Sequence, residues 1–249
     1  MLKDAIWLAT NEYKQNITAV FITFFASSLL GFILGGTFTN PDPFIIKIRS
    51  TSVTPYLFDF MIIGTAPAFS SLFMSKPYLS YKSARKNPYL KQMAVLRTLP
   101  ITLSALALSR ILFMILTLLT MSLAFFGSIG ILIAVFPDYV LTLFTISELI
   151  LLMIVWFGFM LAVGGLSPFL EYGTSGKALH IIPFIYVAII TIAIIVFYQY
   201  FSSGIAENII GLVKTVGWPV ALFSMTIGIA GCLGWNRLLQ QRMANKDFL

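Results

Sequence analysis

Apolar residues are gathered into six long segments, which alternate with shorter stretches that hold most of the polar side chains. A helix that crosses a bilayer needs about 20 mostly apolar residues, so each segment is predicted to span a membrane. The end of the third segment is open, since it could continue to Val135 with Pro137 and Asp138 as the turn. The predicted spans are residues 17–36, 56–74, 106–130, 140–165, 181–200 and 218–235.

Composition agrees with this pattern and narrows the class of protein. The chain has 249 residues, of which 59% are hydrophobic and 10% are charged. A soluble domain has roughly a quarter charged residues, and a disordered chain combines low hydrophobicity with high net charge, so both classes are excluded. We therefore expect an all-α integral membrane protein in which residues 1–249 form a single transmembrane domain.

Lys and Arg are distributed unequally among the connecting stretches, which predicts the orientation of the spans. Twelve of them fall in the two tails and in the second and fourth connections, whereas three fall on the opposite side. Both termini are therefore expected on the cytoplasmic side, in agreement with an even number of spans. The net charge of +7 then reflects cytoplasmic loops and not a surface for nucleic acid. The three residues on the outer side are Lys47, Arg49 and Lys214.

Two segments outside the spans are predicted to be amphipathic helices at the membrane surface. One is the N-terminal tail, residues 2–13, and the other is the connection between the fifth and sixth spans, near residues 205–216. For the second, a re-entrant outer helix and an ordinary interfacial loop both stay open. The residues that share an apolar face are Leu2, Ile6, Ala9 and Tyr13 in the first, and Ile205, Ile209, Leu212 and Val216 in the second.

The connection between the second and third spans contains a short predicted helix, Pro88 to Leu99. Asn87 suits its cap and Pro88 its first position, while Pro100 lacks the amide hydrogen that would continue it. Arg97 can reach solvent. Two interpretations are open: a basic loop that binds anionic lipid headgroups, or a helix that docks into a cleft of a cytoplasmic partner. The residues that share its apolar face are Tyr89, Met93 and Leu96.

The residues after this helix read Leu99-Pro100-Ile101-Thr102, and a basic residue, Arg110, follows ten positions after the proline. This pattern resembles the permease subunits of ABC exporters of the type-two family, which are half-size bacterial proteins with six spans. Many of them carry a Leu-Pro-Ile/Val-Ser/Thr element after a short cytoplasmic coupling helix. The layout is similar too, with an amphipathic N-terminal helix and a long connection between the second and third spans.

The resemblance implies that two permease subunits, identical or related, form the translocation path in a bacterial cytoplasmic membrane, and that separate ABC ATPase subunits bind beneath them. ATP and Mg²⁺ would be bound by those ATPases, so this chain is expected to bind no cofactor and to be no enzyme. The apolar first and fifth spans indicate an amphiphilic exported substrate, such as a peptide, an antibiotic or a lipid-like molecule. Coupling to the ATPase is assigned to Pro88, Tyr89, Leu90, Met93, Leu96, Arg97 and Pro100.

Charged residues in or near the spans are candidates for function because a charge inside a bilayer is costly. Arg110 is expected at the cytoplasmic boundary, with its long side chain among the headgroups. Asp59 is expected near the outer surface and solvated. Glu148 lies roughly 12 Å into the fourth span if that helix starts at Val140, and is interfacial if it starts near Thr145. Arg110 and Glu148 are retained as candidate residues of the translocation pathway.

Small residues predict where spans approach one another closely. Gly31-x-x-x-Gly35 lies in the first span and Gly158-x-x-x-Ala162 in the fourth. The pattern of the second span is interrupted at Gly64, Ala66 and Pro67, and that of the fifth span at Pro183.

Motifs for catalysis on this chain are missing. The stretch closest to a phosphate-binding loop, residues 173–178, has its first glycine at the wrong distance and no Ser or Thr after its lysine. One cysteine, Cys232, and one histidine, His180, argue against a metal site. The alternative function is a stand-alone six-span protein, an immunity factor or a secondary transporter, although no inverted repeat typical of such transporters is visible. The scarcity of catalytic groups disfavours an intramembrane enzyme.

Overall fold

The computed structural model describes residues 2–39, 56, 59–137, 145–201 and 203–245, which form helices and no strand. Five stretches of helix in this part of the chain are long and apolar enough to cross a membrane, one of them formed by α11 and α12 together. This is compatible with a multi-pass membrane protein. The long helices are α2 (Ile17–Thr39), α9 (Leu103–Val135), α11 (Ile146–Gly164), α13 (Ala178–Phe201) and α15 (Trp218–Ala244).

Several helix boundaries differ from those predicted. The α9 helix starts at Leu103, where the side chain of Thr102 accepts a hydrogen bond from an amide of the first turn, and it runs to Val135, the longer alternative. The α15 helix continues past the predicted end at Trp235 because its last turns bury apolar side chains. The α11 helix begins at Ile146, and the predicted start of the fourth span at Val140 lies outside the described residues.

The second predicted span is not one continuous helix in the part that the structure describes. A π-helix, η1 (Phe60–Gly64), is followed by a turn at Thr65 and then by the four-residue helix α5 (Ala66–Phe69). The predicted interruption at Gly64, Ala66 and Pro67 therefore falls where the helix changes type. Pro67 lies in the first turn of α5, where its missing amide hydrogen is tolerated, whereas α13 continues through Pro183. Among the described residues, five stretches are long and apolar enough to span a membrane, and the second predicted span is not one of them.

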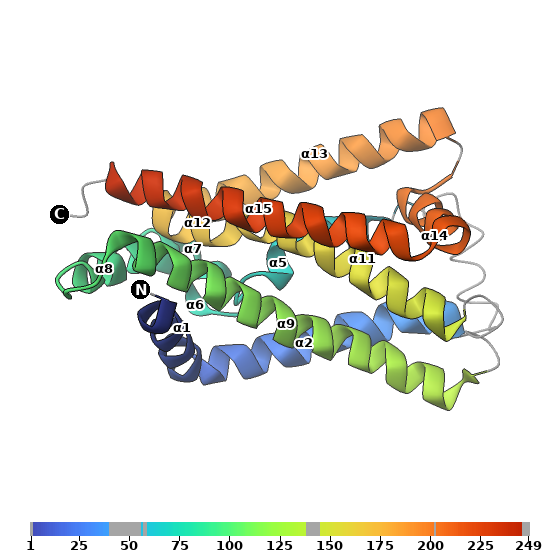
Figure 1. Ribbon diagram of the computed structural model, residues 1–249, viewed down its shortest axis with the longest axis horizontal. Coiled ribbons are helices and arrows are strands. Elements are labelled where there is room, and N and C mark those ends of the chain that lie inside the picture. Colours follow the sequence, from blue (N-terminus) through green and yellow to red (C-terminus); the bar gives the residue numbers. More distant parts are fainter. Residues whose placement is uncertain (1, 40–55, 57–58, 138–144, 202, 246–249) are drawn as a thin grey trace.

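The broken segment nevertheless makes contacts toward both ends of the helical bundle. Near its start, the Asp59 carboxylate accepts hydrogen bonds from the backbone of α14 (Ile205–Val216). Further along, the Ser70 hydroxyl bonds the Ser167 hydroxyl of α12 (Leu166–Gly173) at 2.8 Å. The helices α12 and α14 lie at opposite ends of the bundle (Figure 1).

Figure 1 shows which segments gather at each end. The helices α1 (Leu2–Gln15), α8 (Pro88–Leu96) and α12 lie together with the end of α15, and we call this the terminal end. The opposite side, which holds α14, is called the α14 end. The predicted cytoplasmic segments that the structure describes are thus collected at one end, whereas Lys47, Arg49 and Lys246 lie outside the described residues. Two short helices of the long connection are α6 (Lys76–Leu79) and α7 (Tyr81–Ala84).

The long helices form two tight pairs, α2 with α9 and α11 with α15. A Cβ atom placed on Gly31 would overlap the carbonyl oxygen of Phe125, and one placed on Gly158 would lie 2.6 Å from the carbonyl oxygen of Ser224. Both glycines therefore allow a backbone approach that a side chain would prevent, which confirms the predicted role of the small-residue motifs. The α13 helix diverges from α15 toward the α14 end (Figure 1).

Candidate functional site at the terminal end

The predicted coupling helix exists as α8 and lies at the terminal end. Its Met93 side chain is fully buried, in a cluster that includes Leu8 of α1, Leu106 of α9 and Leu239 of α15. Tyr89 and Leu96 pack against the same cluster. The apolar face predicted to dock into a partner is therefore turned into this protein, because three neighbouring helices already provide the apolar surface that it covers.

The ends of α8 also differ from the prediction. The helix stops at Leu96 instead of Leu99, and the residues that follow form tight turns. Asn87 takes the cap position in the left-handed region, with φ of 51°, but its side chain does not bond the first turn of the helix. Its Oδ1 accepts a hydrogen bond of 2.6 Å from the amide of Gly176 instead. The start of α8 is thereby tied to the connection between α12 and α13.

The sequence predicts that the Arg110 side chain lies among the headgroups. In the structure it lies in the interior at the terminal end. It is 2% exposed and forms an ion pair with Glu12 of α1. Its guanidinium also donates to the Tyr172 hydroxyl at 2.8 Å and stacks 4.5 Å from the centre of that ring. The Tyr172 hydroxyl donates to Glu12 at 3.2 Å. A buried charge needs this kind of pairing, because the protein interior does not solvate it.

Gln92 connects α8 to the buried charges. Its side-chain amide donates to the Glu12 carboxylate at 3.1 Å. We call Glu12, Gln92, Arg110 and Tyr172 the arginine cluster. Its members come from α1, α8, α9 and α12, so one polar network joins the two surface helices to a long apolar helix.

A second carboxylate, half-buried, lies close by. Glu171 of α12 accepts a hydrogen bond of 2.6 Å from the Tyr78 hydroxyl of α6. Burial raises the pKa of Tyr78 well above its ordinary value, and burial likewise raises the pKa of Tyr89 on α8. Both phenols therefore stay protonated at neutral pH, and Tyr78 acts as a neutral donor to Glu171. These contacts add α6 to the helices held together at the terminal end.

The outward side of α8 is formed by Lys91 and Val95, both exposed, with Val95 at 67%. Arg97 follows the helix and donates to the carbonyl of Met243 at 2.6 Å, which holds it against the end of α15. Of the remaining predicted coupling residues, Pro88 and Leu90 are half-buried and Pro100 is exposed.

The α1 helix confirms the predicted helical tail, and of its predicted apolar face Ala9 is buried and Tyr13 packs against the core. Leu2 and Ile6 are 59% and 48% exposed, whereas Glu12 is buried. The prediction missed Glu12, although Ala5, Leu8, Ala9 and Glu12 recur at helical spacing. The position of Glu12 at the end of this apolar stripe is a sequence signal for a buried carboxylate. The sequence does not show that Arg110 is its partner.

The predicted pathway residue Glu148 lies at the α14 end, in the first turn of α11. It is exposed, and with Thr145 it forms a capping box in which each side chain bonds the backbone of the other residue. This position favours the interfacial alternative. Asp59, expected to be solvated, is fully buried and accepts from the amides of Ile205 and Ala206 at 2.7 and 2.8 Å. The unpaired amides at the start of α14 explain its burial.

Comparison of the chain with protein-family profiles, curated proteins and solved structures finds no match. The site is therefore interpreted from its own geometry. Within the described residues, no group of three or more metal-binding side chains comes together.

Proposed function

We propose that this protein is the transmembrane subunit of an ATP-driven exporter of the ABC type, in which two permease subunits pair and separate ATPase subunits bind at the terminal end. The substrate is an amphiphilic molecule. One observation carries the proposal: α8 presents Lys91 and Val95 to the outside while its opposite face is joined to α1, α9 and α15. A helix held in this way can receive a force from a partner and pass it to the long helices.

The contacts supply two routes for that force. Met93 transmits it by packing, because a close-packed interior moves as a unit. Gln92 transmits it through Glu12 to Arg110 on α9. Movement of α8 would therefore tilt α1 and α9 together, which is the rigid-body kind of switch that alternating access requires.

The basic character of the terminal end supports a cytoplasmic position for α8. Lys82, Arg85, Lys86 and Lys91 are exposed, and such residues concentrate on the cytoplasmic side of membrane proteins. With α8 on that side, its outward face is available to an ATPase that uses cytoplasmic ATP.

The test is purification of the tagged chain from its native cells in mild detergent, followed by a search for a stoichiometric partner that hydrolyses ATP. Val95→Asp places a charge at the outward face of α8 and should release the partner. Leu79→Asp is the matched control, because Leu79 on α6 is 66% exposed and Val95 is 67% exposed. Changing Met93 would be uninformative, since its burial makes loss of folding the expected result.

We expect the partner to be retained by Leu79→Asp and lost from Val95→Asp, with both variants eluting as folded protein. Retention of the ATPase by Val95→Asp would exclude α8 as the contact. Purification of the chain without an ATPase, repeated in several mild detergents, would favour the stand-alone alternative.

A further inference from the structure

The half of the bundle near α14 contains a cavity of about 450 Å³, within the range of roughly 300–1,000 Å³ found for small-molecule sites. It separates the α2–α9 pair from the α11–α15 pair, and the first turns of α14 close its end. Residues from each wall include Leu34, Phe126, Trp156, Ile209 and Phe223.

The lining offers almost nothing to a polar ligand. Ser224 has the one hydroxyl among the described lining residues, and that hydroxyl donates to the carbonyl of Val155 at 2.7 Å. The indole nitrogen of Trp156 likewise donates to the carbonyl of Ile62 at 3.1 Å. A polar group brought into the cavity would lose its hydrogen bonds to water without replacement, which is unfavourable.

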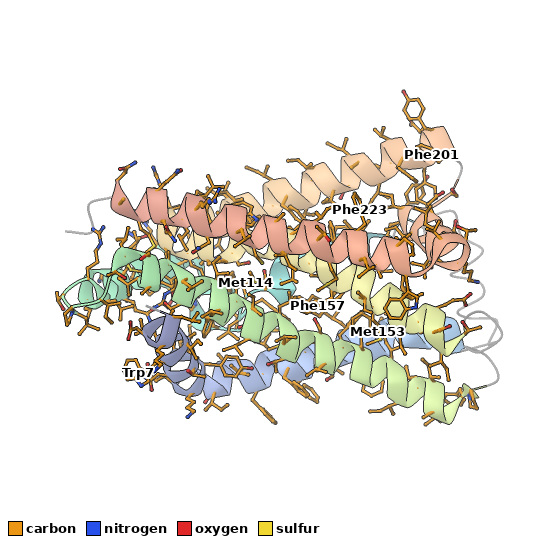
Figure 2. All side chains as sticks on the ribbon, in the orientation of Figure 1. Trp7, Met114, Met153, Phe157, Phe201 and Phe223 are labelled. Carbon is orange, nitrogen blue, oxygen red and sulfur yellow. The ribbon has the colours of Figure 1, made fainter. Side chains whose placement is uncertain are left out.

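The cavity opens sideways among apolar side chains. Met153 on α11 and Phe223 on α15, both labelled in Figure 2, line the cavity and are 37% and 68% exposed. Ile227, one turn further along α15, lines it too and is 47% exposed. An apolar chain dissolved in the bilayer could therefore enter without crossing a polar surface.

We infer that this cavity binds the alkyl chain of an amphiphile that enters from the surrounding bilayer. The absence of free polar groups from its described lining excludes a headgroup from the interior. The headgroup remains at the α14 end, where the exposed Glu148 directly precedes the lining residue Leu149. The alkyl chain can belong to a phospholipid or to a single-chain amphiphile. If the protein is the proposed exporter, this cavity is the site that holds the tail of the exported molecule. Binding of the alkyl chain does not itself require an ATPase.

Trp156 provides a direct probe, because bromine atoms on an alkyl chain quench a tryptophan only at contact. One variant keeps Trp156 alone (Trp7→Phe, Trp218→Phe, Trp235→Phe). The matched variant keeps Trp218 alone, which starts α15 and is 60% exposed. Each is placed in phosphatidylcholine nanodiscs, and either dibromostearate or dibromostearoyl phosphatidylcholine is titrated.

Quenching of Trp156 is expected to saturate at a low mole fraction of the brominated molecule, whereas quenching of Trp218 should follow that fraction in proportion. Saturation in the dibromostearate arm assigns the site to single-chain amphiphiles, and saturation in the phospholipid arm assigns it to phospholipids. No quenching of Trp156, or quenching in proportion as for Trp218, would mean contact with bulk lipid only and would overturn the inference.

Two glycines of α9 supply a second measurement that keeps all four tryptophans. A Cβ atom on Gly130 or on Gly127 meets no atom within 4 Å, but only Gly130 lines the cavity. Gly130→Phe should lower the amount of dibromostearate or phospholipid retained in native mass spectra by about tenfold, because the ring occupies the space of the chain. Gly127→Phe should retain the wild-type amount. Equal retention by both variants would overturn the inference. The chain is measured without an ATPase, so this outcome is distinct from failure of the proposed function.

Discussion

The two ends of the bundle are built on different principles. At the terminal end, side chains from α1, α8, α9 and α12 meet in the arginine cluster, and packing around Met93 leaves that residue fully buried. At the α14 end, the helix pairs separate around the apolar cavity. Polar and apolar contacts between helices thus fill the terminal end, whereas the α14 end leaves space between the helix pairs.

The comparison also separates two uses of charge in an apolar protein. Arg110 and Glu12 neutralise one another inside the protein and connect distant segments of the chain. Glu148, by contrast, remains exposed and bonds residues of its own first turn. Exposed charges can also bind distant segments, as Arg97 does at the carbonyl of Met243, but only the buried pair brings two opposite charges together inside the protein.

The largest effect is expected from Arg110→Met, which leaves the Glu12 carboxylate buried and unpaired. Removing one partner of a buried ion pair costs about 3–5 kcal/mol, so the free energy of unfolding in mild detergent should fall by that amount. The double variant Arg110→Met with Glu12→Leu should recover most of the loss, because no buried charge remains. A single variant as stable as the wild type would show that the cluster does not hold the terminal end together.

A smaller and more local effect is expected from Asp59→Ala at the α14 end. Two amides of α14 lose a charged acceptor, and hydrogen bonds to charged groups contribute about 1.5–3 kcal/mol each. Hydrogen exchange should accelerate at Ile205 and Ala206, with no change in peptides from α8. Asp59→Asn, which keeps one acceptor oxygen, should give an intermediate rate. Equal acceleration at both ends would contradict the independence of the two regions.

The smallest effect is expected from Glu148→Gln. Gln can also complete a capping box, and the loss of a cap altogether costs typically about 1 kcal/mol. We expect the unfolding temperature, and the ATP hydrolysis of the proposed complex with an ATPase, to stay near wild-type values. Strongly reduced hydrolysis at an unchanged unfolding temperature would return Glu148 to the translocation pathway.

The sequence predicts much of this fold because membrane-spanning helices are encoded locally. Length and apolar content identify the five long helices, and the small-residue motif around Gly158 identifies a close contact between two of them. Length and apolar content do not predict the structure of the second predicted span correctly. Its composition is apolar enough, but the helix changes type at Gly64 and turns at Thr65, and the same loss of an amide hydrogen at Pro183 leaves α13 continuous.

The candidate site was only partly predictable for a different reason. The position of α8 follows from Asn87 and Pro88, which are neighbours in sequence. The partners Glu12, Arg110 and Tyr172 lie far apart along the chain, and their meeting depends on how whole helices pack. The inward direction of Met93 depends on the same packing, so a pattern within α8 cannot distinguish a docking face from a buried one.

The exposure of α13 has an evolutionary consequence. Leu179 and Ile194 are its buried residues, while side chains such as Phe184 and Ile189 are 75% and 59% exposed. Natural selection on such a surface acts on apolar character more than on shape. In related chains α13 should drift freely among Ile, Val, Leu and Phe, whereas α11, confined by α15 at Gly158, should record few changes.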